Sequence, residues 1–222
     1  MTTATIAPSA PPAVPAAPAA PTVPPLPEAP PLEARGLLPA LRPLDWVGAR
    51  GLSDDGFCDS AAYVALSREL CAALSCHGAT VSQRGLGELN LSVHRAWDRA
   101  ADNLLHAAQT DEGTRFLTRP AAHILGAGVP GLQIATPGAP ATAWLAHPHT
   151  FTVLDRHLTH LLGEPVIYLA PGHETLLALP ATAADPKSLQ RWARHAVDTL
   201  GAASPVSGSP LVWRHGFPAV VG

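Results

Sequence analysis

Several residue types are scarce in this chain, and each shortage narrows the classes of protein to which it can belong. Its 222 residues include three cysteines, and aromatic side chains make up only 5% of the total. Cys58, Cys71 and Cys76 contain no Cys-x-x-Cys pair, which excludes a zinc ribbon and a thioredoxin-like redox motif. We expect three mostly buried thiols in a reducing compartment.

Positive charge is also scarce, and it is dispersed along the chain. Fourteen basic residues stand against 17 acidic ones, for a formal net charge of −3. Lys187 is the only lysine, and the arginines alternate with acidic residues rather than forming a run. Proteins that bind nucleic acids need basic side chains gathered on one face, so we expect no nucleic-acid partner.

No long apolar segment is present. A membrane-spanning helix needs about 20 consecutive apolar residues, and no stretch of the chain approaches that length. The N-terminal stretch has no basic side chain before Arg35, and prolines interrupt its apolar residues, a pattern unlike a secretory signal peptide. The sequence therefore predicts a cytoplasmic protein with no membrane partner.

Proline, in contrast, is concentrated at the N-terminus, where the first 43 residues hold 13 of the 25 prolines. Proline fixes φ and removes an amide donor, so we expect residues 1–43 to form a disordered Pro/Ala-rich tail. Residues 44–222 are expected to form a single α+β domain, and residues 32–51 an irregular or short helical arm at the boundary. The tail contains the PxxP spacing of docking peptides, but a simple spacer explains the same composition.

Four helices are predicted from apolar positions that recur at three and four residues. The first runs from Ser53 to about His77, and the second follows an N-cap at Ser92. The third begins at Thr150 and ends at Gly163. The fourth follows the cap and proline pair Asp185-Pro186 and ends at Gly201.

Strands are predicted between these helices. Residues 166–169 and 175–179 are apolar on both alternating faces, which is typical of central strands. We expect them to form a hairpin closed by a type II turn at Pro171-Gly172. A short strand is expected at residues 143–145, and edge strands are expected at residues 114–118, 132–136 and 211–215. The fold class is therefore α+β, with helices packed on a mostly antiparallel sheet.

Residues 91–104, in the second predicted helix, contain Ala100-x-x-Asn103-Leu104, and residues 165–177 hold two apolar strands around Pro171. Together these segments resemble an uncharacterised YtpQ-like family of bacterial cytoplasmic proteins, in which a helix ending in Ala-x-x-Asn-Leu precedes two apolar strands joined by a Pro-Asn-Arg-Asp-like turn. The resemblance covers about half of the chain and omits the proline tail. The positions that match the family pattern are Ala100, Asn103, Leu104, Pro171, Thr175 and Leu176. Because Gly172, His173 and Glu174 replace the family's Asn, Arg and Asp, no role for a guanidinium at the turn carries over.

The polar residues inside these segments are the predicted binding residues: Asn103, His173 and Glu174. A shared polar pocket would bring all three together. Their alternative roles are turn formation for His173 and Glu174 and capping of the helix C-terminus for Asn103, and the sequence leaves both interpretations open.

Eleven histidines raise the possibility of a metal site. His147, His149 and Asp155 are close in sequence and match the ligand types of a small metal-dependent hydrolase. His157 and His160 follow, but His160 points away from the apolar side of the predicted helix, and no HExxH motif is present. The sequence therefore predicts no bound metal or cofactor.

Motifs for other chemistry are incomplete. Cys58 lacks an identifiable histidine partner, and Ser204, Ser207 and Ser209 lie in a loop without a Gly-x-Ser-x-Gly motif. Residues 126–131 fit Gly-x-Gly-x-x-Gly, but an extended segment rather than a helix follows, so we interpret them as a glycine-rich loop.

The residues thus assign no catalytic group, and a non-enzymatic module that binds a protein partner is the leading hypothesis. A small metal-dependent hydrolase and an immunity-type protein that neutralises a toxin are the alternatives.

Overall fold

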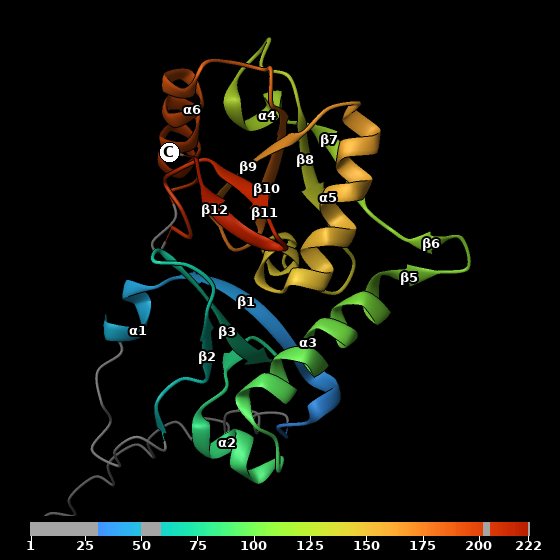
Figure 1. Cartoon of the computed structure of the whole chain (residues 1–222), viewed down its shortest axis with the longest axis vertical. Helices are drawn as coiled ribbons and strands as arrows, with labels where there is room; N and C mark the ends of the chain where they lie inside the picture. The colour runs from blue at the N-terminus through green and yellow to red at the C-terminus, as the bar shows by residue number, and fades with distance from the viewer. Residues whose placement is uncertain (1–30, 50–58, 202–204, 222) are drawn as a thin grey trace, which may run out of the picture. The chain divides into compact units, whose positions relative to one another are not determined.

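A computed structural model describes residues 31–49, 59–201 and 205–221. Residues 1–30 of the predicted 1–43 tail lie outside these ranges, as do Cys58 and Ser204. Residues 31–222 form one compact unit, and its described part is an α+β fold with helices packed on antiparallel sheets (Figure 1). No helix in the described ranges is long and apolar enough to cross a membrane.

A four-stranded antiparallel sheet occupies the first half of the unit. Strand β3 is central, β1 pairs with one of its edges, and β2 and β4 pair with the other. The strands are β1 (Leu37–Pro43), β2 (Tyr63–Ala65), β3 (Leu70–Cys76) and β4 (Ala79–Thr80). The helical elements of this half are η1 (Ala34–Gly36), α1 (Asp45–Ala49), α2 (Gln83–Glu88) and α3 (Val93–Ala108).

A six-stranded antiparallel sheet occupies the second half, in the order β12-β11-β9-β10-β8-β7. Its strands are β7 (Leu117–Pro120), β8 (Leu132–Ala135), β9 (Val166–Gly172), β10 (Thr175–Pro180), β11 (Leu211–Arg214) and β12 (Phe217–Val220). The helical elements are α4 (Ala122–Leu125), η3 (Ala141–Ala146), α5 (Pro148–Leu162) and α6 (Pro186–Leu200). A short hairpin of β5 (Gln109–Thr110) and β6 (Gly113–Thr114) follows α3.

The core is divided by the six-stranded sheet. On one face, Tyr168 and Leu176 join a large cluster that also contains α3, α5, η3 and strands of the smaller sheet. On the other face, Ile167 and Leu177 pack against α4 and α6. Helices α5 and α6 accordingly lie on opposite faces of the sheet (Figure 1).

Local signals predicted the second and fourth helices correctly. Ser92 Oγ accepts a hydrogen bond from the Arg95 amide at the start of α3, and the Asp185 carboxylate accepts from two amides at the start of α6. Gly163 and Gly201 end α5 and α6 in the left-handed region, as expected. Strands β9 and β10 are central in their sheet, as their apolar sequence predicts.

Other predicted elements were wrong. The helix expected from Ser53 to His77 is replaced, in its described part, by strands β2 and β3. Residues 37–43, expected in an irregular or helical arm, form β1, so a strand precedes Leu44, the predicted start of the domain. The expected strand at residues 143–145 is the 3₁₀ helix η3.

Two further corrections concern boundaries. Helix α5 is capped by His147 and not by Thr150, whose hydroxyl instead donates to the Trp144 and His147 carbonyls. The β9–β10 turn is formed by His173 and Glu174 and not by Pro171-Gly172, because both of those residues belong to β9.

Prolines occupy outward-facing positions on three edge strands. Just beyond the ends of these strands, three backbone amides donate hydrogen bonds to carbonyls of the neighbouring chain segment: Leu44 to Glu69, Ala121 to Gly131 and Val221 to Pro210. Because antiparallel ladders alternate, these bonds place four prolines with their nitrogens directed away from the neighbouring strand: Pro39 and Pro43 on β1, Pro120 on β7 and Pro218 on β12. Proline is tolerated there because no ladder donor is lost, and it limits pairing with a further strand.

Candidate functional site

Asn103 is explained by the edge of β1. Its amide nitrogen donates to the Ala34 carbonyl at 2.8 Å and to the Leu37 carbonyl at 2.9 Å. By the alternation described above, Leu37 directs its carbonyl away from β3, so Asn103 supplies the donor that a further strand would have given. The predicted role in capping the helix C-terminus is wrong, because α3 continues to Ala108.

His173 and Glu174 differ in environment although both form the β9–β10 turn. The His173 carbonyl accepts a hydrogen bond from the Thr142 hydroxyl at 2.6 Å, and the side chain of Glu174 is exposed. The His173 ring is largely buried, and its Nε2 atom has no hydrogen-bond partner among the described residues. Burial, and to a lesser degree the nearby Arg42 guanidinium, lowers the pKa of His173 to about 4, so the ring is neutral at pH 7.

The predicted binding residues do not share one pocket. Asn103 contacts Leu37 at the start of β1, whereas His173 lies near Arg42 toward the end of that strand. Five residues of extended strand separate Leu37 from Arg42, which corresponds to about 17 Å. A ligand that contacts all three predicted residues would therefore have to reach across the sheet.

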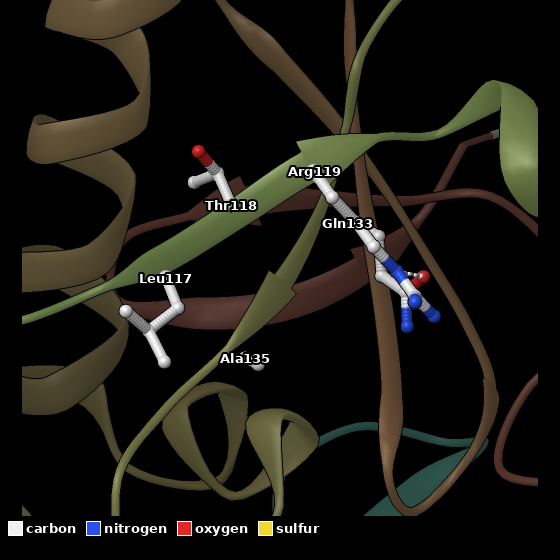
Figure 2. Close-up of a pocket in the computed structure, with 5 residues that line it drawn as sticks. All are labelled: Leu117, Thr118, Arg119, Gln133 and Ala135. Atoms are coloured by element: carbon white, nitrogen blue, oxygen red, sulfur yellow. Dashed lines mark hydrogen bonds between the residues drawn. The ribbon is translucent and has the colours of Figure 1, made fainter.

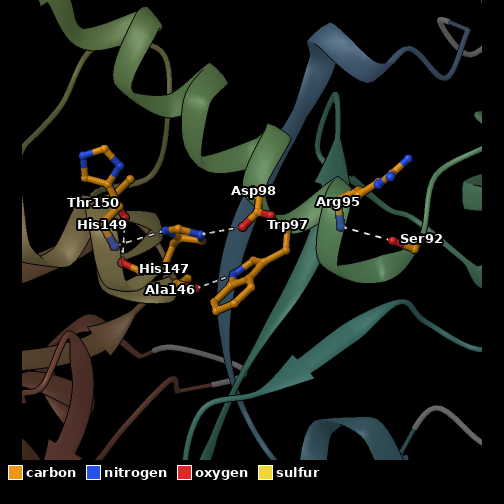
Figure 3. A network of polar contacts seen from close by, with 8 residues as sticks. All are labelled: Ser92, Arg95, Trp97, Asp98, Ala146, His147, His149 and Thr150. Carbon is orange, nitrogen blue, oxygen red and sulfur yellow. Dashed lines mark hydrogen bonds and ion pairs between the residues drawn. The ribbon is translucent and has the colours of Figure 1, made fainter.

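His147, the first candidate ligand of the hydrolase alternative, belongs to a polar network that joins α3 to the start of α5 (Figure 3). Its Nε2 atom lies 3.3 Å from an Asp98 carboxylate oxygen, and its Nδ1 atom accepts the His149 amide at 3.1 Å. The ring packs against Trp97 with centroids 4.4 Å apart, and the Trp97 indole donates to the Ala146 carbonyl at 2.8 Å.

These contacts determine the tautomer of His147. A ring nitrogen that accepts a hydrogen bond carries no proton, so the proton of the neutral ring is on Nε2 and is donated to Asp98. Burial lowers the pKa of His147, which favours this neutral form, while Asp98 acts in the opposite direction. The ring's one in-plane lone pair, on Nδ1, already accepts the His149 amide, so it is available to a metal or a substrate proton only if the helix cap opens.

The other candidate ligands of the hydrolase alternative and the nearby His157 lie in separate places. His149 is exposed, Asp155 accepts the Tyr168 hydroxyl at 2.8 Å, and His157 packs on Phe116 at 4.9 Å. Among the described residues, no group of three or more His, Cys, Asp or Glu side chains is arranged to hold a metal ion.

The loop motifs have structural explanations. Gly131, the last glycine of the Gly-x-Gly-x-x-Gly match, has φ +115° and would place a Cβ atom 2.5 Å from the Ala178 carbonyl oxygen. The sheet thus requires glycine at this position. Ser207 and Ser209 form the turn hydrogen bonds expected of a loop, from the Ser207 hydroxyl to the Ser209 carbonyl and from the Ser209 amide to the Ser207 hydroxyl.

A pocket of about 350 Å³ lies at the open end of the six-stranded sheet (Figure 2). We define the β7–β8 face as Leu117, Arg119, Gln133 and Ala135, which lie on one side of these strands because Leu117 pairs with Ala135 and Arg119 with Gln133. Gln133 also pairs with Leu177 of β10, and Leu177 is covered by α4 and α6. The β7–β8 face is thus the part of this sheet surface beyond the covering helices.

The β7–β8 face combines an apolar patch with an oriented cation. The side chain of Leu117 is 47% exposed, among the largest exposures of an apolar side chain in the described residues. The Arg119 Nε atom donates to the Gln133 side-chain oxygen at 2.7 Å, which fixes the guanidinium plane beside the pocket (Figure 2). Its terminal amino groups have no acceptor within the described ranges.

Sequence reasoning missed the β7–β8 face. Each of its four residues is ordinary for a short strand, and their arrangement depends on pairing between residues 14 and 18 positions apart. The available signal was an exposed Leu-x-Arg alternation in a predicted edge strand, which by itself does not distinguish a binding surface from a solvated edge.

Comparisons with known proteins found no similarity that identifies the chain. No family model matches it, no curated protein matches it, and no solved structure matches it. The resemblance to the YtpQ-like family stays a prediction.

Proposed function

We propose that the protein is a non-enzymatic, cytoplasmic binding module that takes a protein partner on the β7–β8 face. The observation that carries the proposal is the exposed Leu117 beside a guanidinium that Gln133 holds in place. Arginine is enriched among the residues that dominate protein interfaces, and the centre of an interface is more apolar than its rim.

The mode of binding follows from the edge of β7. Pro120 removes one outward-facing donor, so Thr118 is the only residue of this four-residue strand that directs an amide outward. Addition of a long strand is therefore disfavoured, and the partner is expected to bind by side chains. The matching chemistry is an apolar side chain next to a carboxylate, which would fill the pocket and pair with Arg119.

Two features support the cytoplasmic assignment and the absence of an enzymatic role. Cys71 and Cys76 are buried free thiols, as in proteins of reducing compartments. The hydrolase alternative would require His147 to give up one of its two hydrogen bonds, so the geometry favours binding over metal-dependent hydrolysis. An immunity-type protein would be one form of this module, with a toxin as the partner.

Site-specific photocrosslinking in the cells that produce the protein tests the proposal. A benzophenone amino acid at position 117 should capture one discrete protein, and Arg119→Glu should abolish that product. Leu161 of α5 is a matched control, since it is 51% exposed on another surface. A product of equal yield at positions 117 and 161, or one unaffected by Arg119→Glu, would contradict the assignment.

Deletion of the N-terminal tail separates its contribution from that of the folded unit. Removal of residues 1–30 leaves β1 in place, whereas removal of residues 1–43 deletes this strand. If the β7–β8 face is sufficient, the chain that begins at Pro31 retains the crosslink. Loss of the crosslink on removal of residues 1–30 would show that the tail is required for partner binding.

A further inference from the structure

A second pocket, of about 400 Å³, lies between α5 and the strands β9 and β11. Trp213 pairs with the edge strand β12 and lies on the α5 side of the sheet, where its indole nitrogen donates to the Thr152 hydroxyl at 3.2 Å. Residues 152, 155 and 159 are three and four apart on α5, so one helix face is turned toward this ring. The residues that line the pocket are Asp155, Thr159, Pro165, Val166, Ile167, Ala181, Val212 and Trp213.

The carboxylate in this pocket is unusual because its surroundings are mostly apolar. Asp155 is half-buried, and one of its oxygens accepts the hydroxyl of the buried Tyr168 at 2.8 Å. Within the described part of the chain Asp155 forms no ion pair. A carboxylate that is partly removed from water without a cation is destabilised in its charged form, and burial accordingly raises the pKa of Asp155.

The aromatic wall complements this carboxylate. Trp213 is 38% exposed, and an indole face attracts cations through its quadrupole. Val166 and the methylenes of Pro165 provide apolar surface for the stem of a ligand. A negative charge, an accessible indole and aliphatic walls together select an ammonium group carried on an alkyl chain.

We propose that this pocket binds an organic ammonium ion, with Asp155 as the counter-ion, Trp213 as the aromatic wall and the aliphatic residues around the alkyl stem. The site is separate from the β7–β8 face and does not depend on the function proposed above. A hard metal ion is a poor match, because such ions need six or more oxygen ligands and the pocket supplies one carboxylate.

Two sources share this chemistry, namely a free alkylamine and the side chain of a lysine in a polypeptide. The probes are n-butylammonium chloride and N-acetyl-lysine methylamide, and n-butanol is the uncharged control of matched shape. Binding to the full chain is followed by the indole N–H resonance of Trp213 in ¹H–¹⁵N spectra, assigned with a Trp213→Phe variant.

Both ammonium probes should shift this resonance to saturation, whereas n-butanol should shift it at least tenfold less at equal concentration. Asp155→Asn retains an acceptor for Tyr168 and should weaken ammonium binding at least tenfold. Tyr168→Phe retains the carboxylate and should still bind. Tighter binding of the lysine diamide would assign the source as a polypeptide, and equal binding would assign the ammonium group alone.

The proposal is overturned if neither ammonium probe gives a saturable shift, or if n-butanol binds as well as n-butylammonium. Unchanged ammonium affinity in a folded Asp155→Asn protein would overturn it as well. Arg119→Glu should leave ammonium binding intact, so this test and the crosslinking test fail independently.

Discussion

Acidification should destabilise the fold through His173 in a defined pH range. The pKa of this ring falls from the ordinary 6.5 to about 4 in the folded protein. Because the unfolded chain takes up a proton more readily, the stabilising contribution of neutral His173 is complete above about pH 6.5. It is then lost progressively as the pH falls toward 4, and no further loss is expected below that value.

The magnitude follows from the size of the shift. A difference of roughly 2.5 pKa units corresponds to about 3 kcal/mol at 1.36 kcal/mol per unit. The ring retains some contact with solvent, which screens the charged form, so we expect about 1–2 kcal/mol. This is a large fraction of the stability of an ordinary domain, about 5–15 kcal/mol.

The assay is urea unfolding followed by tryptophan fluorescence at several pH values between 7.5 and 4. His173→Phe keeps a flat ring and removes the titratable group. Between pH 7.5 and 4, the free energy of unfolding of this variant should therefore fall by about 1–2 kcal/mol less than that of the natural protein. At pH 7.5 the substitution should cost little, because the buried Nε2 atom has no hydrogen-bond partner to lose among the residues that the structure describes.

His147 is the necessary comparison, since burial lowers its pKa too and gives a loss of the same sign over an overlapping range. The difference between the natural protein and His173→Phe isolates the contribution of His173, because His147 is present in both. Parallel stability profiles for the two proteins between pH 6.5 and 4 would refute the reasoning.

Two further predictions concern backbone space and thiol reactivity. Gly131→Ala should destabilise the protein by about 3 kcal/mol or more, because Gly131 combines a positive φ with close approach to Ala178. Gly128 also has a positive φ but has open space around it, so Gly128→Ala should cost only about 1–2 kcal/mol. Equal losses of stability in thermal unfolding of the two variants would contradict the packing argument. Burial raises the pKa of the Cys71 thiol to about 11, so at pH 8 about one thiol in a thousand is ionised, and mass spectrometry should find Cys71 unmodified by iodoacetamide until the protein is unfolded.

The elements that the sequence predicted are those whose signals are local. A capping side chain at Ser92 or Asp185 contacts amides within the next three residues, so nothing distant is needed to recognise it. The same is true of Gly163 and Gly201, which end their helices by their own conformation. The central position of β9 and β10 was predictable because both faces of these strands had to be apolar.

The failures concern elements whose nature depends on distant partners. Strand β3 is buried on nearly all its residues between two other strands, so it shows no alternation, and its small and apolar residues at three and four positions imitate a helix. All six residues of η3 are buried, so this segment also lacks a polar side that would reveal its period. The hairpin turn was misplaced because Pro171 and Gly172 continue strand β9, and the residues that form the turn, His173 and Glu174, include neither glycine nor proline.

The candidate site was not predictable for the same reason, and its character follows from how the sheet edges are closed. Strand β1 was not predicted and β7 was predicted only in part, and in the fold the prolines of both strands direct their nitrogens away from the neighbouring strand. An edge with fewer outward donors accepts a further strand less readily, so the surfaces favoured for recognition are faces and pockets rather than edges. The exposed Leu117 with Arg119, and Trp213 with Asp155, are side-chain surfaces of this kind, each beside an edge strand that carries such a proline.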